Sequence, residues 1–150
     1  MQIYQNIFLI FYGVSLTSAP AACRTIADFL NDTNTAPSDY DMILTGDLGS
    51  VGSELLCELM IKQENIDISA VHEDCGLMIF DSEKQKDVGA GGSGCGCSGA
   101  VVCSDIISRI ESAELKKVLF VGTGALMSGV STLQSESIPA VAHGVLITGG

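Results

Sequence analysis

The stretch VLFVGTGALMSGVSTLQSESIPAVAHGVLIT, residues 118–148, holds two apolar segments joined by a polar loop without a helical pattern. We expect strands at Val118–Leu126 and Ile138–Thr148. Strands joined only by a loop are usually antiparallel neighbours, whereas parallel strands need a longer crossover, usually a helix. The sequence therefore predicts an antiparallel edge of a sheet at the end of the chain.

Upstream of this edge, strands and helices alternate along the chain. The expected strands are Ile3–Gly13, Tyr40–Gly49 and Asp74–Asp81, and the expected helices run from Pro20 to Leu30, from Ser50 to Gln63 and from Ser98 to Ser112. Pro20 suits the first turn of the first helix, and Ser50 the N-cap of the second. The order βαβαβαββ implies helices on both faces of a mostly parallel sheet. The predicted fold class is α/β, in three layers.

Length and composition place these elements in one densely packed domain, residues 1–150. A chain of 150 residues is long enough to bury a core, and no repeat or linker divides it. Apolar residues make up 47% of the chain and charged residues 17%. We therefore expect a buried core and, in addition, an apolar face that meets a partner.

The net charge of −11 excludes several classes of partner. With seven Lys and Arg against 18 Asp and Glu, the chain repels nucleic acid and anionic lipid. The apolar run Ile7–Leu16 is too short to span a bilayer, and no basic residue before Arg24 supplies the n-region of a signal peptide. We expect no nucleic-acid partner and no transmembrane segment.

Six cysteines lie in apolar or glycine-rich surroundings, without the regular spacing of a disulfide framework. A single residue separates Cys95 from Cys97, whereas paired zinc ligands are typically about two to four residues apart. We expect no metal site, and reduced, mostly buried thiols in an intracellular compartment. The other four cysteines are Cys23, Cys57, Cys75 and Cys103.

The glycine-rich stretch GAGGSGCGCSGAVVCSDI, Gly89–Ile106, admits more than one explanation. It lacks the Gly-Lys-Ser/Thr ending of a phosphate loop. Backbone N–H groups that lead into a helix can still bind an anion or a carbonyl oxygen. Close packing of backbone against backbone is the alternative, because glycine has no side chain in the way.

Candidate catalytic and binding side chains are few. A nucleophilic cysteine would need a base, and the chain has only His72 and His143. We expect His143 in a core strand and His72 solvated in a polar loop, so no catalytic dyad is predicted. Asp47 and Asp74 lie where strands meet loops, and ligand sites of α/β sheets cluster at such junctions. Lone acids at these places are more often turn or cap residues.

Six segments, in order along the chain, carry a family resemblance. They are SAPAACRTIADF (18–29), YDMILTGDLGSVGSELL (40–56), DCGLMIFD (74–81), GAGGSGCGCSGAVV (89–102), VLFVGTGALMS (118–128) and SIPAVAHGV (137–145). Together they resemble the C-terminal half of the stage V sporulation protein AD family, thiolase-like proteins of endospore-forming bacteria. The resemblance implies one βαβαβαββ half of a thiolase fold, with residues 1–17 as a divergent first strand and the N-terminal half absent.

The resemblance also bears on catalysis. The glycine-rich stretch is similar to the thiolase motif Gly-His-Pro-x-Gly-x-Ser-Gly, with Ser93 at the place of the catalytic histidine. The residues GDLG at 46–49 stand where ketoacyl synthases carry a His-Gln-Ala-Asn turn. The resemblance therefore implies a non-enzymatic protein without catalytic residues or a cofactor. An acyltransferase of the ketoacyl synthase or thiolase type, and a truncated non-functional fragment, are the rival hypotheses.

The resemblance further implies that the protein binds dipicolinic acid, accompanied by calcium, and helps to import it into the developing spore. The implied partners are membrane-embedded proteins of the same operon, met at the cytoplasmic face of the forespore or spore inner membrane. A homodimer, or pairing with an N-terminal thiolase-like half, completes the assembly. By similarity to the thiolase pocket, the candidate ligand-binding residues are Asp47, Gly92, Ser93, Gly94 and Cys95.

Overall fold

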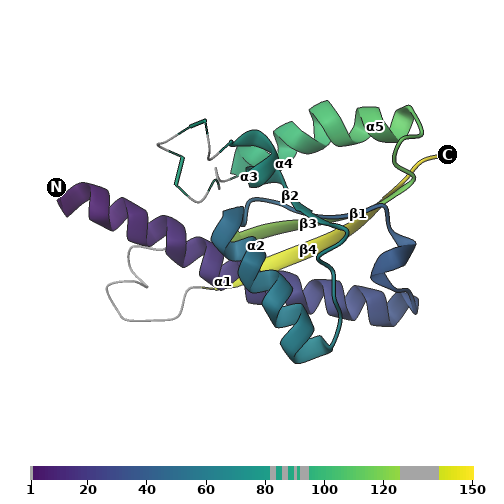
Figure 1. Cartoon of the computed structure of the whole chain (residues 1–150), viewed down its shortest axis with the longest axis horizontal. Coiled ribbons are helices and arrows are strands. Elements are labelled where there is room, and N and C mark those ends of the chain that lie inside the picture. The colour runs from purple at the N-terminus through teal and green to yellow at the C-terminus, as the bar shows by residue number, and fades with distance from the viewer. Residues whose placement is uncertain (1, 82–83, 86–87, 90, 92–94, 126–138) are drawn as a thin grey trace.

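Four strands and a series of helices form the described part of the chain (Figure 1). The computed structural model describes residues 2–81, 84–85, 88–89, 91, 95–125 and 139–150. In chain order the elements are α1 (Gln2–Thr33), the 3₁₀ helix η1 (Pro37–Asp39), β1 (Met42–Thr45), α2 (Gly49–Leu59), the π-helical turn η2 (Met60–Glu64), β2 (His72–Asp74), α3 (Cys75–Ile79), α4 (Cys95–Val101), the π-helical turn η3 (Val102–Ile106), α5 (Ile107–Glu111), β3 (Lys117–Ala125) and β4 (Ala140–Thr148).

The strands form one sheet in the order β2-β1-β3-β4. Strand β1 is parallel to both β2 and β3, whereas β4 is antiparallel to β3. In register, Ile43 lies opposite His72 on one side and Leu119 on the other. The prediction of an α/β fold with a mostly parallel sheet and an antiparallel edge is confirmed.

Helices cover both faces of this sheet, as Figure 1 shows: α1 and α2 lie on one side of the strands and α3, α4 and α5 on the other. Side chains alternate between the two faces along a strand. Ile43 and Leu119 accordingly join the buried cluster formed with α1 and α2. Leu44 and Val118 belong to a second cluster, with Cys97 and other residues of the opposite helices. The three predicted layers are therefore present.

The N-terminal segment differs from the prediction. Residues Ile3–Gly13 were expected to form a strand, but they belong to helix α1, and Pro20 lies inside that helix instead of in its first turn. An apolar run cannot be assigned to strand or helix by its hydrophobicity alone. This run continues, without a turn signal, into buried positions at helical spacing such as Ala22 and Ile26. The predicted order βαβαβαββ thus lacks its first strand.

The segment Asp74–Asp81 was also predicted as a strand, and only its first residue is part of one. Strand β2 ends at Asp74, and Cys75 begins helix α3. The carboxylate of Asp74 accepts a hydrogen bond from the Gly76 N–H at 3.0 Å. A capping carboxylate of this kind favours the start of a helix. The N-cap therefore overrides the strand propensity of the apolar residues that follow.

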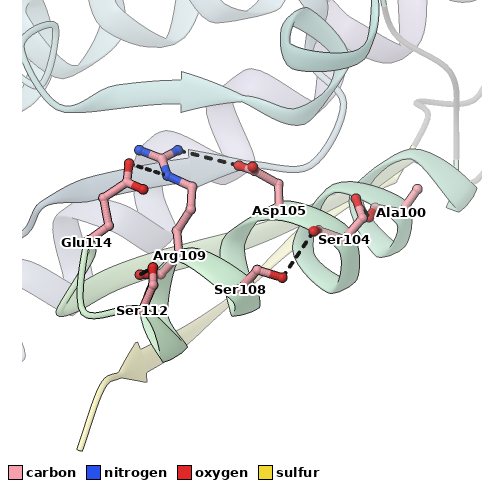
Figure 2. Close-up of polar contacts among 7 residues, drawn as sticks. All are labelled: Ala100, Ser104, Asp105, Ser108, Arg109, Ser112 and Glu114. Carbon is pink, nitrogen blue, oxygen red and sulfur yellow. Dashed lines mark hydrogen bonds and ion pairs between the residues drawn. The ribbon is translucent and has the colours of Figure 1, made fainter.

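The predicted helix Ser98–Ser112 is confirmed, and it begins earlier, at Cys95. Figure 2 shows the polar contacts along it: Arg109 donates to Glu114 at 2.8 Å and to Asp105 at 3.4 Å. The hydroxyl of Ser104 donates to the carbonyl of Ala100 at 2.7 Å. These exposed contacts add little stability each. The helix is therefore held mainly by the apolar residues that it buries against the sheet.

Five cysteine side chains are described, and none of these five is part of a disulfide bond. Cys23, Cys75 and Cys97 are buried, Cys57 is half-buried and Cys103 is exposed. Within the described ranges, no helix combines the length and apolar character needed to cross a membrane.

Candidate functional site

The carboxyl ends of the parallel strands meet at one edge of the sheet, the region where α/β folds bind ligands. Thr45 ends β1 and Asp74 ends β2, and these two residues are opposite each other. On β3, Val121 lies opposite Thr45, so Thr123 extends beyond the end of β1. Asp47 follows Thr45 by two positions. We take this edge as the candidate site.

A fully buried carboxylate, that of Asp74, organises the edge. Its Oδ2 accepts hydrogen bonds from the Thr45 hydroxyl at 2.7 Å and the Leu48 N–H at 2.8 Å. Its Oδ1 accepts from the N–H groups of Gly49 at 2.9 Å and Gly76 at 3.0 Å. Burial raises the pKa of Asp74 above its ordinary value, and the four hydrogen bonds oppose that shift. One side chain thus joins β1, α2, β2 and α3.

The same carboxylate accepts two hydrogen bonds at the N-terminus of α2. The N-cap position is Leu48, so the predicted capping role of Ser50 is wrong. Gly49 has φ +66°, a left-handed conformation that glycine adopts without strain. Because Asp74 already accepts from Leu48 and Gly49, these N–H groups are engaged within the protein. The interpretation of Asp74 as a cap residue is confirmed, since it is the N-cap of α3, and the Leu48 and Gly49 N–H groups are not free to bind an external anion.

Asp47 lies beside the end of β3. The Thr123 hydroxyl donates to Asp47 Oδ1 at 3.1 Å. The loop reaches β3 because residue 46 is glycine: a Cβ there would lie 3.0 Å from Thr123 Oγ1 and 3.1 Å from its backbone nitrogen. Asp47 is half-buried, so part of its side chain faces solvent. The structure therefore places Asp47 at the carboxyl edge, as its position after a strand predicted.

The described part of the glycine-rich stretch packs tightly against α3. Gly91 has φ +88°, and its carbonyl oxygen would lie only 2.6 Å from a Cβ built on Gly76. Packing of backbone on backbone therefore accounts for Gly91. The candidate residues Gly92, Ser93 and Gly94 lie outside the described residues. Cys95 is the first residue of α4, and its side chain is also outside what the structure describes.

A contact between a histidine and a cysteine lies beside Asp74 and was not predicted. His72 was expected to be solvated in a loop, but it is a half-buried residue of β2. Its Nε2 is 3.0 Å from the Thr45 hydroxyl, and its Nδ1 is 3.8 Å from the Cys57 sulfur. Thr45 donates its proton to Asp74 at 2.7 Å, so it accepts from Nε2–H. This assigns Nδ1 as the acceptor that faces the Cys57 thiol.

Both members of this pair are neutral near pH 7. Burial lowers the pKa of His72 to about 4. Burial also raises the pKa of the Cys57 thiol, and the charge of Asp67 adds to that shift. The thiolate is the reactive form of cysteine. The chain from Cys57 through His72 and Thr45 to Asp74 is therefore suited to joining α2 to the sheet, not to nucleophilic attack.

The second histidine, His143, was predicted in the core, but it is exposed on β4. Strand β4 is an edge strand of the sheet, and most of its residues, His143 among them, are exposed. His72 and His143 occupy opposite edges of the sheet. No group of three or more His, Cys, Asp or Glu side chains in the described ranges is arranged to hold a metal ion.

The contact between Gly76 and Gly91 makes the first prediction. Gly76→Ala places a methyl group against a backbone carbonyl that cannot rotate away, and we expect a loss of about 1–3 kcal/mol in the free energy of unfolding. Gly99→Ala is the control, since Gly99 lies in α4 with nothing within 4 Å. It should be neutral or stabilising by up to about 1 kcal/mol. Urea unfolding measures both, and equal effects would contradict the packing explanation.

The hydrogen bonds of Asp74 lead to the second prediction. Asp74→Asn keeps the shape but replaces one oxygen by an NH₂ group, which leaves either the Leu48 N–H or the two glycine N–H groups without an acceptor. We expect a loss of about 2–4 kcal/mol in the free energy of unfolding. Glu73→Gln, at an exposed position on the same strand, should stay within about 0.5 kcal/mol. If the two variants unfold alike, Asp74 does not organise this edge.

The low pKa of His72 leads to the third prediction. The unfolded chain takes up a proton at His72 near pH 6.5, whereas the folded protein does so only near pH 4. Stability should therefore fall as the pH falls through this interval, with about 2 kcal/mol lost to His72 between pH 7 and pH 5. His72→Gln should lack this part of the loss, and His143→Gln should retain it. A wild-type profile in His72→Gln would show that His72 titrates normally.

Comparison with known proteins supports the family resemblance carried by the six sequence segments. The family model of stage V sporulation protein AD matches residues 12–148. Stage V sporulation protein AD of Bacillus subtilis (strain 168) is 44% identical over 135 residues, which cover 90% of this chain and 39% of the relative. The chain thus spans well under half of the length of that relative. It belongs to the stage V sporulation protein AD family, a family of sporulation proteins.

Proposed function

We propose that this chain is a non-enzymatic protein of sporulation that binds dipicolinic acid and helps to import it into the developing spore. The observation that carries the proposal is the family match over residues 12–148. Its partners in this role are membrane-embedded proteins of the same operon, which it meets at the cytoplasmic face of the forespore or spore inner membrane. Because the chain covers 39% of its relative, an N-terminal thiolase-like half belongs to the proposed assembly.

The chemistry of the described histidines supports a non-enzymatic role. Acyl transfer by a cysteine needs a base close to an activated thiol. Cys57 has such a neighbour in His72, but burial keeps both groups neutral. The buried Cys75 is further from activation, since burial raises the pKa of its thiol to about 12. Binding without chemistry is therefore the function that these side chains favour.

The ligand is a dianion, and the chain carries a net charge of −11. Calcium bound together with dipicolinate would offset the repulsion, because carboxylate oxygens are preferred calcium ligands. Asp47 lies at the carboxyl edge of the sheet and can approach such a cation. Backbone N–H groups at Gly92, Ser93, Gly94 and Cys95 are the proposed donors to a ligand carboxylate. The N-terminus of α2 is not one of the proposed donors, because Asp74 fills it.

The direct test is calorimetric titration of the purified chain with dipicolinate, with and without calcium. We expect saturable heat that is larger with calcium, and little heat from isophthalate, which has the two carboxylates without the ring nitrogen. Asp47→Asn should weaken binding about tenfold, the effect of losing about 1.4 kcal/mol. Ser93→Ala keeps the backbone N–H that is the proposed donor, so this variant should bind nearly as the wild type does. Asp32→Asn, which makes the same change of charge on α1, should bind as the wild type does.

Two outcomes would count against the proposal. A chain that is folded by circular dichroism but gives no saturable heat would place the ligand site outside these residues. A covalent acyl adduct, detected by mass spectrometry after incubation with acyl-CoA, would favour the acyltransferase instead.

A further inference from the structure

A cysteine and a histidine from different elements meet beside the buried Asp74. Cys57 lies on α2 and His72 on β2, and Cys57 Sγ is 3.8 Å from His72 Nδ1. Thiolate sulfur and imidazole nitrogen bind ions such as Zn²⁺ at about 2.3 Å and about 2.0 Å, so two such ligands of one ion lie about 3.6–4.3 Å apart, depending on the angle at the metal. The pair therefore has the separation that two ligands of one ion would have.

The imidazole of His72 is held with a free lone pair on the side of Cys57. Its Nε2–H donates to the Thr45 hydroxyl at 3.0 Å, and that hydroxyl donates to the Asp74 carboxylate at 2.7 Å. A histidine that binds a metal typically donates its other N–H in this way, which orients the ring. Because burial lowers the pKa of His72, Nδ1 carries no proton at neutral pH that a metal ion would have to displace. His72 is thus oriented to act as a metal ligand through Nδ1.

The surroundings of the pair attract cations and leave it within their reach. Both side chains are half-buried, so each keeps part of its surface in solvent. The Asp67 carboxylate lies close enough for its negative charge to raise the pKa of the Cys57 thiol, and the same charge attracts a cation. The net charge of the chain, −11, acts in the same direction. A metal ion therefore meets no electrostatic barrier on its way to these two donors.

The number of donors indicates which ion the pair would hold. Structural zinc sites use four protein ligands and catalytic zinc sites use three. Across the part of the chain that the structure describes, no group of three or more His, Cys, Asp or Glu side chains is arranged to bind a metal. Soft ions such as Cu(I) prefer thiolate, also accept imidazole, and can be held by two ligands. One sulfur and one nitrogen therefore fit Cu(I) better than Zn²⁺.

We propose that Cys57 and His72 form a binding site for a soft monovalent metal ion, Cu(I). The ion bonds to Cys57 Sγ and to His72 Nδ1, and the thiol proton passes to solvent. The thiolate, the ion and the neutral imidazole then carry no net charge together, so the half-buried site gains no charge on binding. The bound ion joins α2 to β2 directly, next to the hydrogen bonds of Asp74. This activity does not depend on the proposed binding of dipicolinate.

Titration of the full chain with Cu(I), kept reduced by ascorbate, against the coloured chelator bicinchoninate tests the proposal. Loss of a group that only orients a metal ligand costs about 10–100-fold in affinity, so Cys57→Ser and His72→Gln should each weaken the site at least about hundredfold. Glutamine places an amide near the position of Nε2, which keeps the hydrogen bond to Thr45 and removes Nδ1. Cys103→Ser, in η3 on the other face of the sheet (Figure 1), and Cys95→Ser are the matched controls and should bind as the wild type does.

X-ray absorption of the Cu(I) complex gives a second readout, which does not rely on a variant. We expect one sulfur and one nitrogen neighbour of the ion. Circular dichroism checks that each variant is folded, and if His72→Gln unfolds, the nitrogen neighbour in the wild type decides in its place. A wild type that takes no Cu(I) from the chelator, a Cys57→Ser variant that binds equally well, two sulfur neighbours, or displacement of Cu(I) by an equal concentration of Zn²⁺ would each overturn the proposal.

Discussion

The buried carboxylate of Asp74 is the interaction on which the carboxyl edge of the sheet depends. It ends β2, caps α3, closes the N-terminus of α2 and accepts the proton of Thr45, all within 3.0 Å. Placing a carboxylate at zero exposure is costly unless it is fully hydrogen-bonded, and here both oxygens have two donors each. Because Thr45 must donate to Asp74, it can only accept from His72, and this fixes which nitrogen faces Cys57. The relative positions of β1, β2, α2 and α3 at this edge therefore depend on the hydrogen bonds of one buried carboxylate.

This arrangement also limits where a ligand could bind. The N–H groups of a helix N-terminus usually attract anions. At the start of α2, however, the Leu48 and Gly49 N–H groups already donate to the Asp74 carboxylate. Glycine has two functions along the same edge: Gly46 lets the loop approach Thr123, and Gly76 lets Gly91 approach α3. Close packing thus holds Gly91, within the glycine-rich stretch, against the start of α3. Packing and ligand binding are consequently compatible explanations of that stretch, since the residues that pack and the candidate binding residues are different.

Much of the fold could be predicted from the sequence. The correctly predicted elements are those whose apolar residues follow the spacing of one kind of secondary structure only. The antiparallel pair β3 and β4 follows from two apolar runs with no helix between them, and α2 follows from its helical spacing. Segments whose apolar residues fit either a strand or a helix were predicted wrongly. The run Ile3–Gly13 is apolar enough for either structure, and the residues after Asp74 became helical because a capping hydrogen bond competes with strand propensity. The contact of His72 with Cys57 joins residues of β2 and α2, and no local pattern in the sequence brings them together.

The charge of the chain and the design of its sheet edges are two parts of the same argument about assembly. Eighteen acidic residues oppose association wherever two copies would meet face to face, and none of them lies on β4. One of them, Glu73, is exposed on the short edge strand β2, where it opposes strand pairing. The two edge strands therefore differ in what they present to another strand: β2 is short and carries an exposed charge, whereas β4 is long and uncharged.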